Sequence, residues 1–122
     1  MKYICLAYEE ESKLNALSKT EWNMLRDETL AYVERLKNNG HLLATEPLQS
    51  VKTATTVKVR GGKVHIIDGP FAETKETLGG FFLIDASDLN EVIQIASQWP
   101  SARVGSIEIR PIEKELREES RY

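Results

Sequence analysis

The stretch ATTVKVRGGKVHIIDGPFAETKETLGGFFLID, residues 54–85, decides the fold because three of the expected strands lie within it. Valine and isoleucine recur on both sides of Gly61-Gly62, which predicts two strands joined by a two-residue turn. Such a turn requires positive φ angles, and glycine adopts these at little cost. A third apolar strand is expected at residues 81–85.

Three more segments outside this stretch predict strands. Residues 3–8 form a short, nearly continuous apolar run, which suits the middle of a sheet. Residues 41–48 make a weaker strand candidate. Residues 104–112 alternate between apolar and polar side chains, the pattern of a half-buried last strand.

Two helices are expected between these strands. The first begins at an S-x-x-E capping box, residues 18–21, and ends at Gly40. The second begins at residue 87 or 88 and stops before Pro100. Helical spacing predicts that the inward side chains are Trp22, Leu25, Tyr32, Val33 and Leu36 in the first helix, and Leu89, Val92, Ile93 and Ala96 in the second.

The composition is that of one soluble, cytoplasmic domain. A chain of 122 residues and 13.8 kDa fits a single domain. A net charge of −3 gives no basic face for nucleic acid. The single Cys5 excludes an intrachain disulfide and fits a reducing compartment. The first apolar run is too short for a secretory signal, and no apolar run reaches membrane-spanning length, so no membrane association is expected.

The order of elements predicts the layers of the fold. Two helices cannot cover both faces of such a sheet, so one face carries the helices and the other needs a partner. A sheet with a bare apolar face commonly buries it against a second copy. We therefore expect a homodimer.

Three motifs show a family resemblance: DGPFAETKE (68–76), LGGFFLID (78–85) and GSIEIRPI (105–112). Together with the opening MKYICLAY they closely resemble the YCII-related proteins of the DGPF type, over nearly the whole chain up to Pro111. The resemblance implies an α+β, ferredoxin-like βαββαβ monomer with an antiparallel sheet and two helices on one face, which assembles into a dimeric α+β barrel. The charged run EKELREESRY separates a domain at residues 1–112 from a tail at 113–122, for which we expect a solvated helical extension.

The resemblance carries less information about function. Many bacterial members of the group have no assigned activity, and some occur beside, or fused to, extracytoplasmic-function sigma factors. The broader family pairs a helix histidine with an aspartate as its proposed catalytic unit. Aligning residues 29–47 places Thr29 at the histidine position, and threonine cannot act as a general base near neutral pH. The aspartate half is retained as Asp68 without that partner.

The segment that follows Asp68 has the composition of a functional loop. From Asp68 to Gly80 the loop is longer than an ordinary hairpin connection, and Phe71 is expected to bury its ring and hold the loop in place. Asp68 would then be the catalytic carboxylate, with Glu73 and Lys75 contacting substrate. In the alternative reading, Asp68 caps a turn at Gly69-Pro70, and Glu73 and Lys75 pair on the surface.

Three further residues are candidates for substrate binding. Tyr8 closes the first strand together with Glu9, Glu46 precedes Pro47, and Arg110 lies on the last strand, where its planar guanidinium suits a carboxylate. A salt bridge is the alternative role for Arg110. Neither histidine has a companion at metal-ligand spacing, and the chain has no phosphate-binding glycine loop. We therefore expect no metal and no cofactor, and Cys5 is expected to fill the core.

Two classes of function fit these observations. The first is a cofactor-free enzyme on a small organic molecule, of the lyase or isomerase kind, with a pocket near Asp68. The second is a non-catalytic ligand-binding or regulatory module, for which the resemblance implies a sigma factor as partner. A dimer that retains no pocket chemistry is a third reading.

Overall fold

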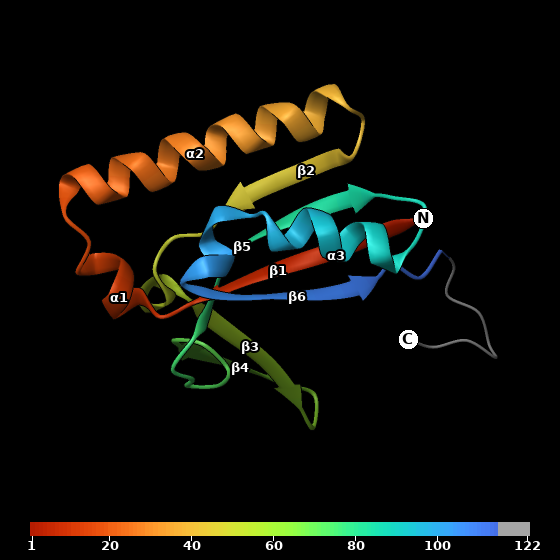
Figure 1. The fold of residues 1–122 in the computed structure, drawn as a ribbon. Helices are drawn as coiled ribbons and strands as arrows, with labels where there is room; N and C mark the ends of the chain where they lie inside the picture. Colours follow the sequence, from red (N-terminus) through yellow and green to blue (C-terminus); the bar gives the residue numbers. More distant parts are fainter. Residues whose placement is uncertain (115–122) are drawn as a thin grey trace.

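The computed structural model describes residues 1–114, so the helical extension expected for the tail lies almost entirely outside the described residues. Three helices and six strands form the described part, with two short 3-10 turns (Figure 1). In chain order these are β1 (Lys2–Glu9), α1 (Glu11–Asn15), α2 (Lys19–Asn38), β2 (Leu42–Pro47), η1 (Val51–Thr53), β3 (Thr55–Arg60), β4 (Lys63–Asp68), β5 (Thr77–Asp85), α3 (Leu89–Ser97), η2 (Pro100–Arg103) and β6 (Gly105–Pro111).

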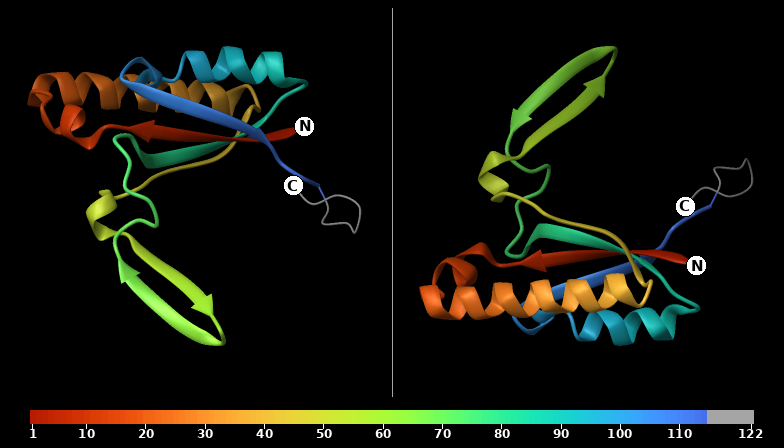
Figure 2. Two further views of the ribbon diagram at one scale, coloured as in Figure 1. Left: turned by 90° about the horizontal axis from the view of Figure 1, so that it is seen from below. Right: turned by 90° about the horizontal axis from the view of Figure 1, so that it is seen from above.

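Four of the strands form one antiparallel sheet in the order β2-β5-β1-β6. With α2 after β1 and α3 after β5, this is the ferredoxin-like arrangement that the sequence predicts. Both long helices lie on the same face of the sheet (Figure 2). The apolar run at residues 3–8 lies at the centre, as expected, because β1 pairs with β5 on one side and β6 on the other.

The core lies between the sheet and the two long helices. Along β1 and β5 every second side chain is buried, which is the two-residue period of a strand with one covered face. Phe82 is fully buried and stacks on Trp99, with 3.9 Å between ring centroids. Other buried members of the core are Tyr3, Cys5, Tyr32, Val33, Leu36, Leu42, Ile84, Val92, Ile95 and Ala96.

Three expected core residues are exposed, and this part of the prediction is wrong. Trp22 is 45% exposed because the buried stripe of α2 is confined to the second half of that helix. In α3 the inward stripe contains Ile95, and Leu89 and Ile93 are about half exposed. Adjacent side chains of a helix point in directions about 100° apart. A small error in the predicted position of the buried stripe around the helix axis therefore exchanges inward and outward residues.

The other two strands, β3 and β4, form a separate hairpin (Figure 1). Gly61 and Gly62 connect them with φ angles of 55° and 76°, which confirms the expected turn. The hairpin is an insertion between β2 and β5, and it projects from the sheet on the side away from the helices (Figure 2). It therefore contributes nothing to the core.

Strand β5 begins four residues earlier than predicted, at Thr77. Glycine permits this, because a Cβ on Gly80 would lie 3.0 Å from the carbonyl oxygen of Glu46 in the neighbouring strand. Gly105 is more tightly constrained still, since a Cβ there would collide with the carbonyl oxygen of Tyr8. Both glycines therefore allow close approach of neighbouring backbone at φ angles that other residues also adopt.

Candidate functional site

Asp68 is the last residue of β4, and its side chain is exposed. The chain turns at Gly69, whose φ of 112° favours glycine. Two hydrogen bonds hold this turn: the Gly69 N–H donates to the Ala54 carbonyl at 2.7 Å, and the Thr56 hydroxyl donates to the Gly69 carbonyl at 2.8 Å. The backbone after Asp68 is therefore held firmly, while its carboxylate makes no ion pair with a described residue.

The loop between β4 and β5 covers residues 69–76 and is shorter than the expected 68–80. Phe71 is 83% exposed, so the expected burial of its ring is wrong for the single chain. The loop lies beside the hairpin and away from the helix-covered core, which leaves the ring nothing to pack against (Figure 1). Glu73 is also exposed.

Lys75 attaches the loop to the end of β1. Its Nζ lies 3.8 Å from Oε1 of Glu10, whose side chain is only 17% exposed. Lys13 approaches the other oxygen of Glu10 at 3.4 Å, so the carboxylate is shared between two cations. Because the lysine is 80% exposed, the contact is weak by itself. The contact nevertheless places a cation of the loop at the end of β1.

Tyr8, Glu46 and Arg110 lie on one face of the sheet, the face without helices. We call this side the open face; it carries the half-buried Ile4, Leu6, Phe81 and Leu83, which alternate with the buried core residues of β1 and β5. Glu46 pairs with Phe81, and Arg110 with Ile4.

The three residues share the open face without forming a cluster. Glu46 and Arg110 lie on the two edge strands with an offset of two residues along the sheet, which places them about 16 Å apart at ordinary strand spacing and rise. Tyr8 lies four residues along β1 from Ile4, the partner of Arg110. In the single chain they therefore line a surface and enclose no pocket.

Glu9, which closes the first strand beside Tyr8, is a stronger candidate in the structure than its sequence position indicates. It is partly buried at the end of β1, and burial, with a smaller contribution from nearby Glu11, raises the pKa of its carboxyl above the ordinary glutamate value. A Cβ on Gly79 would come within 2.9 Å of its Oε2, so the missing side chain leaves room for this carboxylate. Two features of the sequence indicate this position: a glutamate ends an apolar strand, and a neighbouring strand contains the pair Gly79-Gly80.

Glu11 has a structural role beside it. Its carboxylate accepts hydrogen bonds from the Val51 N–H at 2.7 Å and from the Ser50 hydroxyl at 2.8 Å. These bonds lower the pKa of the Glu11 carboxyl. The residue thus ties η1, which precedes the hairpin, to the end of β1.

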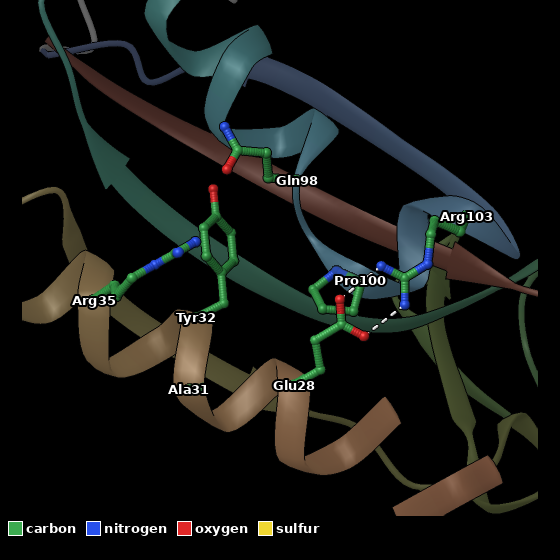
Figure 3. A pocket seen from close by; sticks show the side chains of 7 residues that line it. All are labelled: Glu28, Ala31, Tyr32, Arg35, Gln98, Pro100 and Arg103. Atoms are coloured by element: carbon green, nitrogen blue, oxygen red, sulfur yellow. Dashed lines mark hydrogen bonds and ion pairs between the residues drawn. The ribbon is translucent and has the colours of Figure 1, made fainter. Parts of the chain in front are cut away.

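A groove of about 450 Å³ lies on the opposite, helix-covered side, between α2 and η2 (Figure 3). Arg103 and Glu28 meet across it in two hydrogen bonds of 2.8 and 2.6 Å, which lower the pKa of the Glu28 carboxyl. The Arg35 guanidinium lies 5.0 Å from the centroid of the Tyr32 ring, whose hydroxyl donates to the Ile95 carbonyl. These contacts join α2 to the second half of the chain. The groove contains none of the predicted site residues.

Cys5 has the expected core position, whereas Thr29 makes a local hydrogen bond within α2. The Thr29 hydroxyl donates to the Leu25 carbonyl one helical turn earlier, at 2.8 Å. Cys5 is fully buried, and burial raises the pKa of its thiol to about 12. Within residues 1–114, no three His, Cys, Asp or Glu side chains come together in a manner that could hold a metal ion. None of the described helices is long and apolar enough to cross a membrane.

Known proteins resemble this chain at three levels. The family model of the YCII-related domain matches residues 1–116. An uncharacterised protein of Rhizobium meliloti (strain 1021) is 36% identical over 114 residues, which is 92% of each chain. Among solved structures, 5-chloro-2-hydroxyhydroquinone dehydrochlorinase (TftG) from Burkholderia phenoliruptrix AC1100, in complex with 2,5-dihydroxybenzoquinone, is similar with a TM-score of 0.55. That match covers 93% of this chain and 94% of the other at 16% identity, and so bears on the fold alone.

Proposed function

The chain belongs to the YCII-related family, and from that premise we propose that it is a cytoplasmic, homodimeric enzyme that moves a proton on a small oxygenated organic molecule. The reaction class is elimination or isomerisation, which a carboxylate base and a nearby cation can perform without a cofactor.

One observation carries this proposal: the partly buried carboxylate of Glu9 lies where the loop meets β1, and burial raises its pKa above the ordinary glutamate value. Glu9 occupies the space above Gly79, and Lys75 reaches the adjacent Glu10. A general base works best when its pKa approaches the operating pH, and partial burial moves Glu9 in that direction. Lys75 supplies a positive charge for an anion that develops on the substrate.

Asp68 is the second carboxylate of the proposed site. It lies at the other end of the same loop, on a backbone held by the hydrogen bonds of Gly69. We assign it a substrate contact, with Tyr8, Glu46 and Arg110 of the open face as further contacts and Phe71 and Glu73 at the rim. In the single chain these side chains are too exposed to exclude water, so the proposal requires a second copy.

The chemistry named for the structural neighbour gives the first probes. A dehydrochlorinase removes a proton from its substrate while chloride leaves, which is the class of step proposed here. We would titrate the protein with 2,5-dihydroxybenzoquinone by calorimetry and follow chloride release from 5-chloro-2-hydroxyhydroquinone. Other hydroxylated aromatic compounds would complete the panel.

The decisive variant is Glu9→Gln, with Glu34→Gln as its control. Glu34 is an exposed glutamate of α2, paired with Lys37 and remote from the loop. We expect Glu9→Gln to lower kcat at least about 100-fold, the ordinary contribution of a general base, and Glu34→Gln to leave kcat unchanged. Equal activity in both variants would refute the role of Glu9. In the wild type, the acid limb of the pH–rate profile should lie above the ordinary glutamate range.

A non-catalytic binding module is the second candidate. The exposure of Phe71 and of the hairpin favours it, because exposed apolar side chains often mark protein contacts. Saturable binding of the probe with no turnover by any panel compound would select this alternative. A sigma factor, the partner suggested by family resemblance, would then be the macromolecule to test.

A further inference from the structure

The groove between α2 and η2 differs in charge from one end to the other. At the end nearest Pro100, Glu28 and Arg103 neutralise each other through their two hydrogen bonds (Figure 3). At the other end, the side chain of Arg35 makes no hydrogen bond or ion pair with any residue between 1 and 114. Two guanidiniums and one carboxylate line the groove, so its net charge is +1.

Arg35 is held in place with its hydrogen-bond donors unused. Its Cζ lies 5.0 Å from the centroid of the Tyr32 ring, and such a cation–π contact restricts the side chain without occupying an N–H group. The nearest acid in the chain, Glu34, pairs with Lys37 instead. A guanidinium presented in this way can bind both oxygens of a carboxylate.

The wall beside Arg35 is already ordered. Tyr32 is 6% exposed, its hydroxyl donates to the Ile95 carbonyl at 2.7 Å, and its ring meets Trp99 edge-on with 5.9 Å between centroids. The Gln98 N–H donates to the same Ile95 carbonyl at 3.2 Å, which places Gln98 next to Tyr32. A site that is ordered before its ligand arrives loses less conformational entropy on binding.

We propose that this groove binds a small planar organic carboxylate, with the carboxylate at Arg35 and the apolar body over Ala31 and Pro100. The groove volume of about 450 Å³ is in the range of small-molecule sites. Glu28 repels an anion from the other end, so only one orientation is favourable. The assignment does not rest on the proposed function, because the groove contains no residue of that site.

The net charge selects the class of ligand. A single negative charge matches the groove charge of +1, whereas a phosphate dianion would keep one charge uncompensated beside Glu28. The lining between the two charged ends is an aromatic ring, a methyl group and a proline ring, which suit a flat apolar body. A carboxylate on an aromatic or unsaturated body satisfies both requirements.

The first test is an NMR titration of the whole, isotopically labelled chain with benzoate, benzamide and acetate. Benzamide has the shape of benzoate without its charge, and acetate has the charge without the ring. At about 0.05 M salt, where exposed charges are weakly screened, we expect benzoate to bind with a dissociation constant of about 1 mM or lower. Benzamide and acetate should each bind at least about tenfold more weakly. Benzoate binding no tighter than benzamide would overturn the proposal.

The matched variants are Arg35→Gln and Arg26→Gln. Both remove one positive charge from α2, but Arg26 pairs with Asp27 and does not line the groove. We expect Arg35→Gln to raise the dissociation constant of benzoate at least about tenfold, and Arg26→Gln to change it less than about twofold. Equal effects of the two variants would overturn the assignment, and circular dichroism checks that both are folded.

Two further variants test the groove without touching Arg35. Glu28→Gln removes the repelling carboxylate and should tighten benzoate binding about two- to fivefold, so weaker or unchanged binding contradicts the assignment. Ala31→Trp fills the groove from an exposed helix position and should abolish binding. Benzoate-induced shifts confined to the loop at residues 69–76, and unchanged in Arg35→Gln, would place benzoate in the proposed catalytic site and refute the groove. Failure of catalysis in a protein whose groove still binds benzoate would count against the proposed function alone.

Discussion

The central strands and the hairpin share the same alternation of apolar side chains, but these side chains are buried in the central strands and exposed in the hairpin. In β5, Phe82 and Ile84 are fully buried, while in the hairpin Val64 and Ile66 are about two-thirds exposed. A period of two shows which side chains share a face, and it does not show what covers that face. The helices α2 and α3 cover one face of the central sheet, and no element among residues 1–114 covers the hairpin.

The largest expected contrast is in thiol reactivity. Cys5 has a thiol pKa of about 12, so at pH 8 its reactive thiolate is scarce and also shielded. A reporter cysteine made by Lys63→Cys, at the exposed end of the hairpin, should react with Ellman's reagent at least about 1,000-fold faster. The wild type contains only Cys5, so the difference between variant and wild type under the same conditions gives the rate of the reporter thiol. Rapid reaction of Cys5 in the folded protein would show that the central strands are not shielded from solvent as the structure indicates.

The next contrast is in stability. Phe82→Ala removes a fully buried ring that stacks on Trp99, and should lower the free energy of unfolding by about 3–5 kcal/mol. Urea denaturation measures the change. Phe81→Ala, at the neighbouring position on the open face, is the control and should cost clearly less in dilute protein. Equal costs would show that both faces of β5 are covered in the single chain.

Tyr32→Phe tests the hydrogen bond that links α2 to α3 in the core. The hydroxyl donates to the Ile95 carbonyl at 2.7 Å, and its loss leaves that carbonyl with the longer hydrogen bond from the Gln98 N–H, at 3.2 Å. We expect a loss of about 1–2 kcal/mol, measured by thermal and urea unfolding. Tyr3→Phe offers a control, since that hydroxyl contacts only the weak acceptor Sδ of Met1.

Val59→Ala examines the hairpin in the same way. In dilute protein its cost should be within about 0.5 kcal/mol, as for other exposed substitutions. The cost should grow with protein concentration if a second copy covers this side chain. A large cost that is independent of concentration would mean that the single chain itself buries Val59.

The smallest expected effect concerns Glu9, at the boundary between the two regions. Burial raises its pKa in the folded state, so the folded protein binds this proton more tightly than the unfolded chain does. The stability contributed by the protonated form is therefore present below the unfolded-state pKa and is lost as pH rises through the folded-state pKa. Glu9→Gln should be slightly more stable than wild type at pH 7 and equal to it near pH 3. The opposite order at pH 7 would indicate an unseen partner that stabilises the charged carboxylate.

The sequence predicted the elements that short-range signals determine. The capping box at Ser18 and Glu21 is present, the Gly61-Gly62 turn has the expected positive φ angles, and β1 lies at the centre of the sheet. These depend on neighbouring residues or on local composition. The exposure of Phe71 was not predictable, because burial depends on which elements fold back over the loop.

The candidate site was predictable only in part. Alternation along strands places Tyr8, Glu46 and Arg110 on the open face, but their distances depend on the strand order. The sequence places Glu9 at the end of the first strand but does not single it out, because its pKa is raised by burial and its carboxylate lies beside Gly79, a residue 70 positions away. Pairings of that range depend on register, which one sequence does not specify.

The hairpin also bears on how the chain avoids aggregation. Within the described residues β3 and β4 pair only with each other, so each has an outer edge of unpaired backbone groups beside an apolar face. Such edges can recruit strands from other molecules while the protein is being synthesised. Arg60 and Lys63 stand at the tip and Lys58 on the basic face, where their charges repel a second hairpin that approaches edge to edge. These cations therefore act as gatekeepers, and replacing them with neutral residues should lower soluble yield before it alters the folded structure.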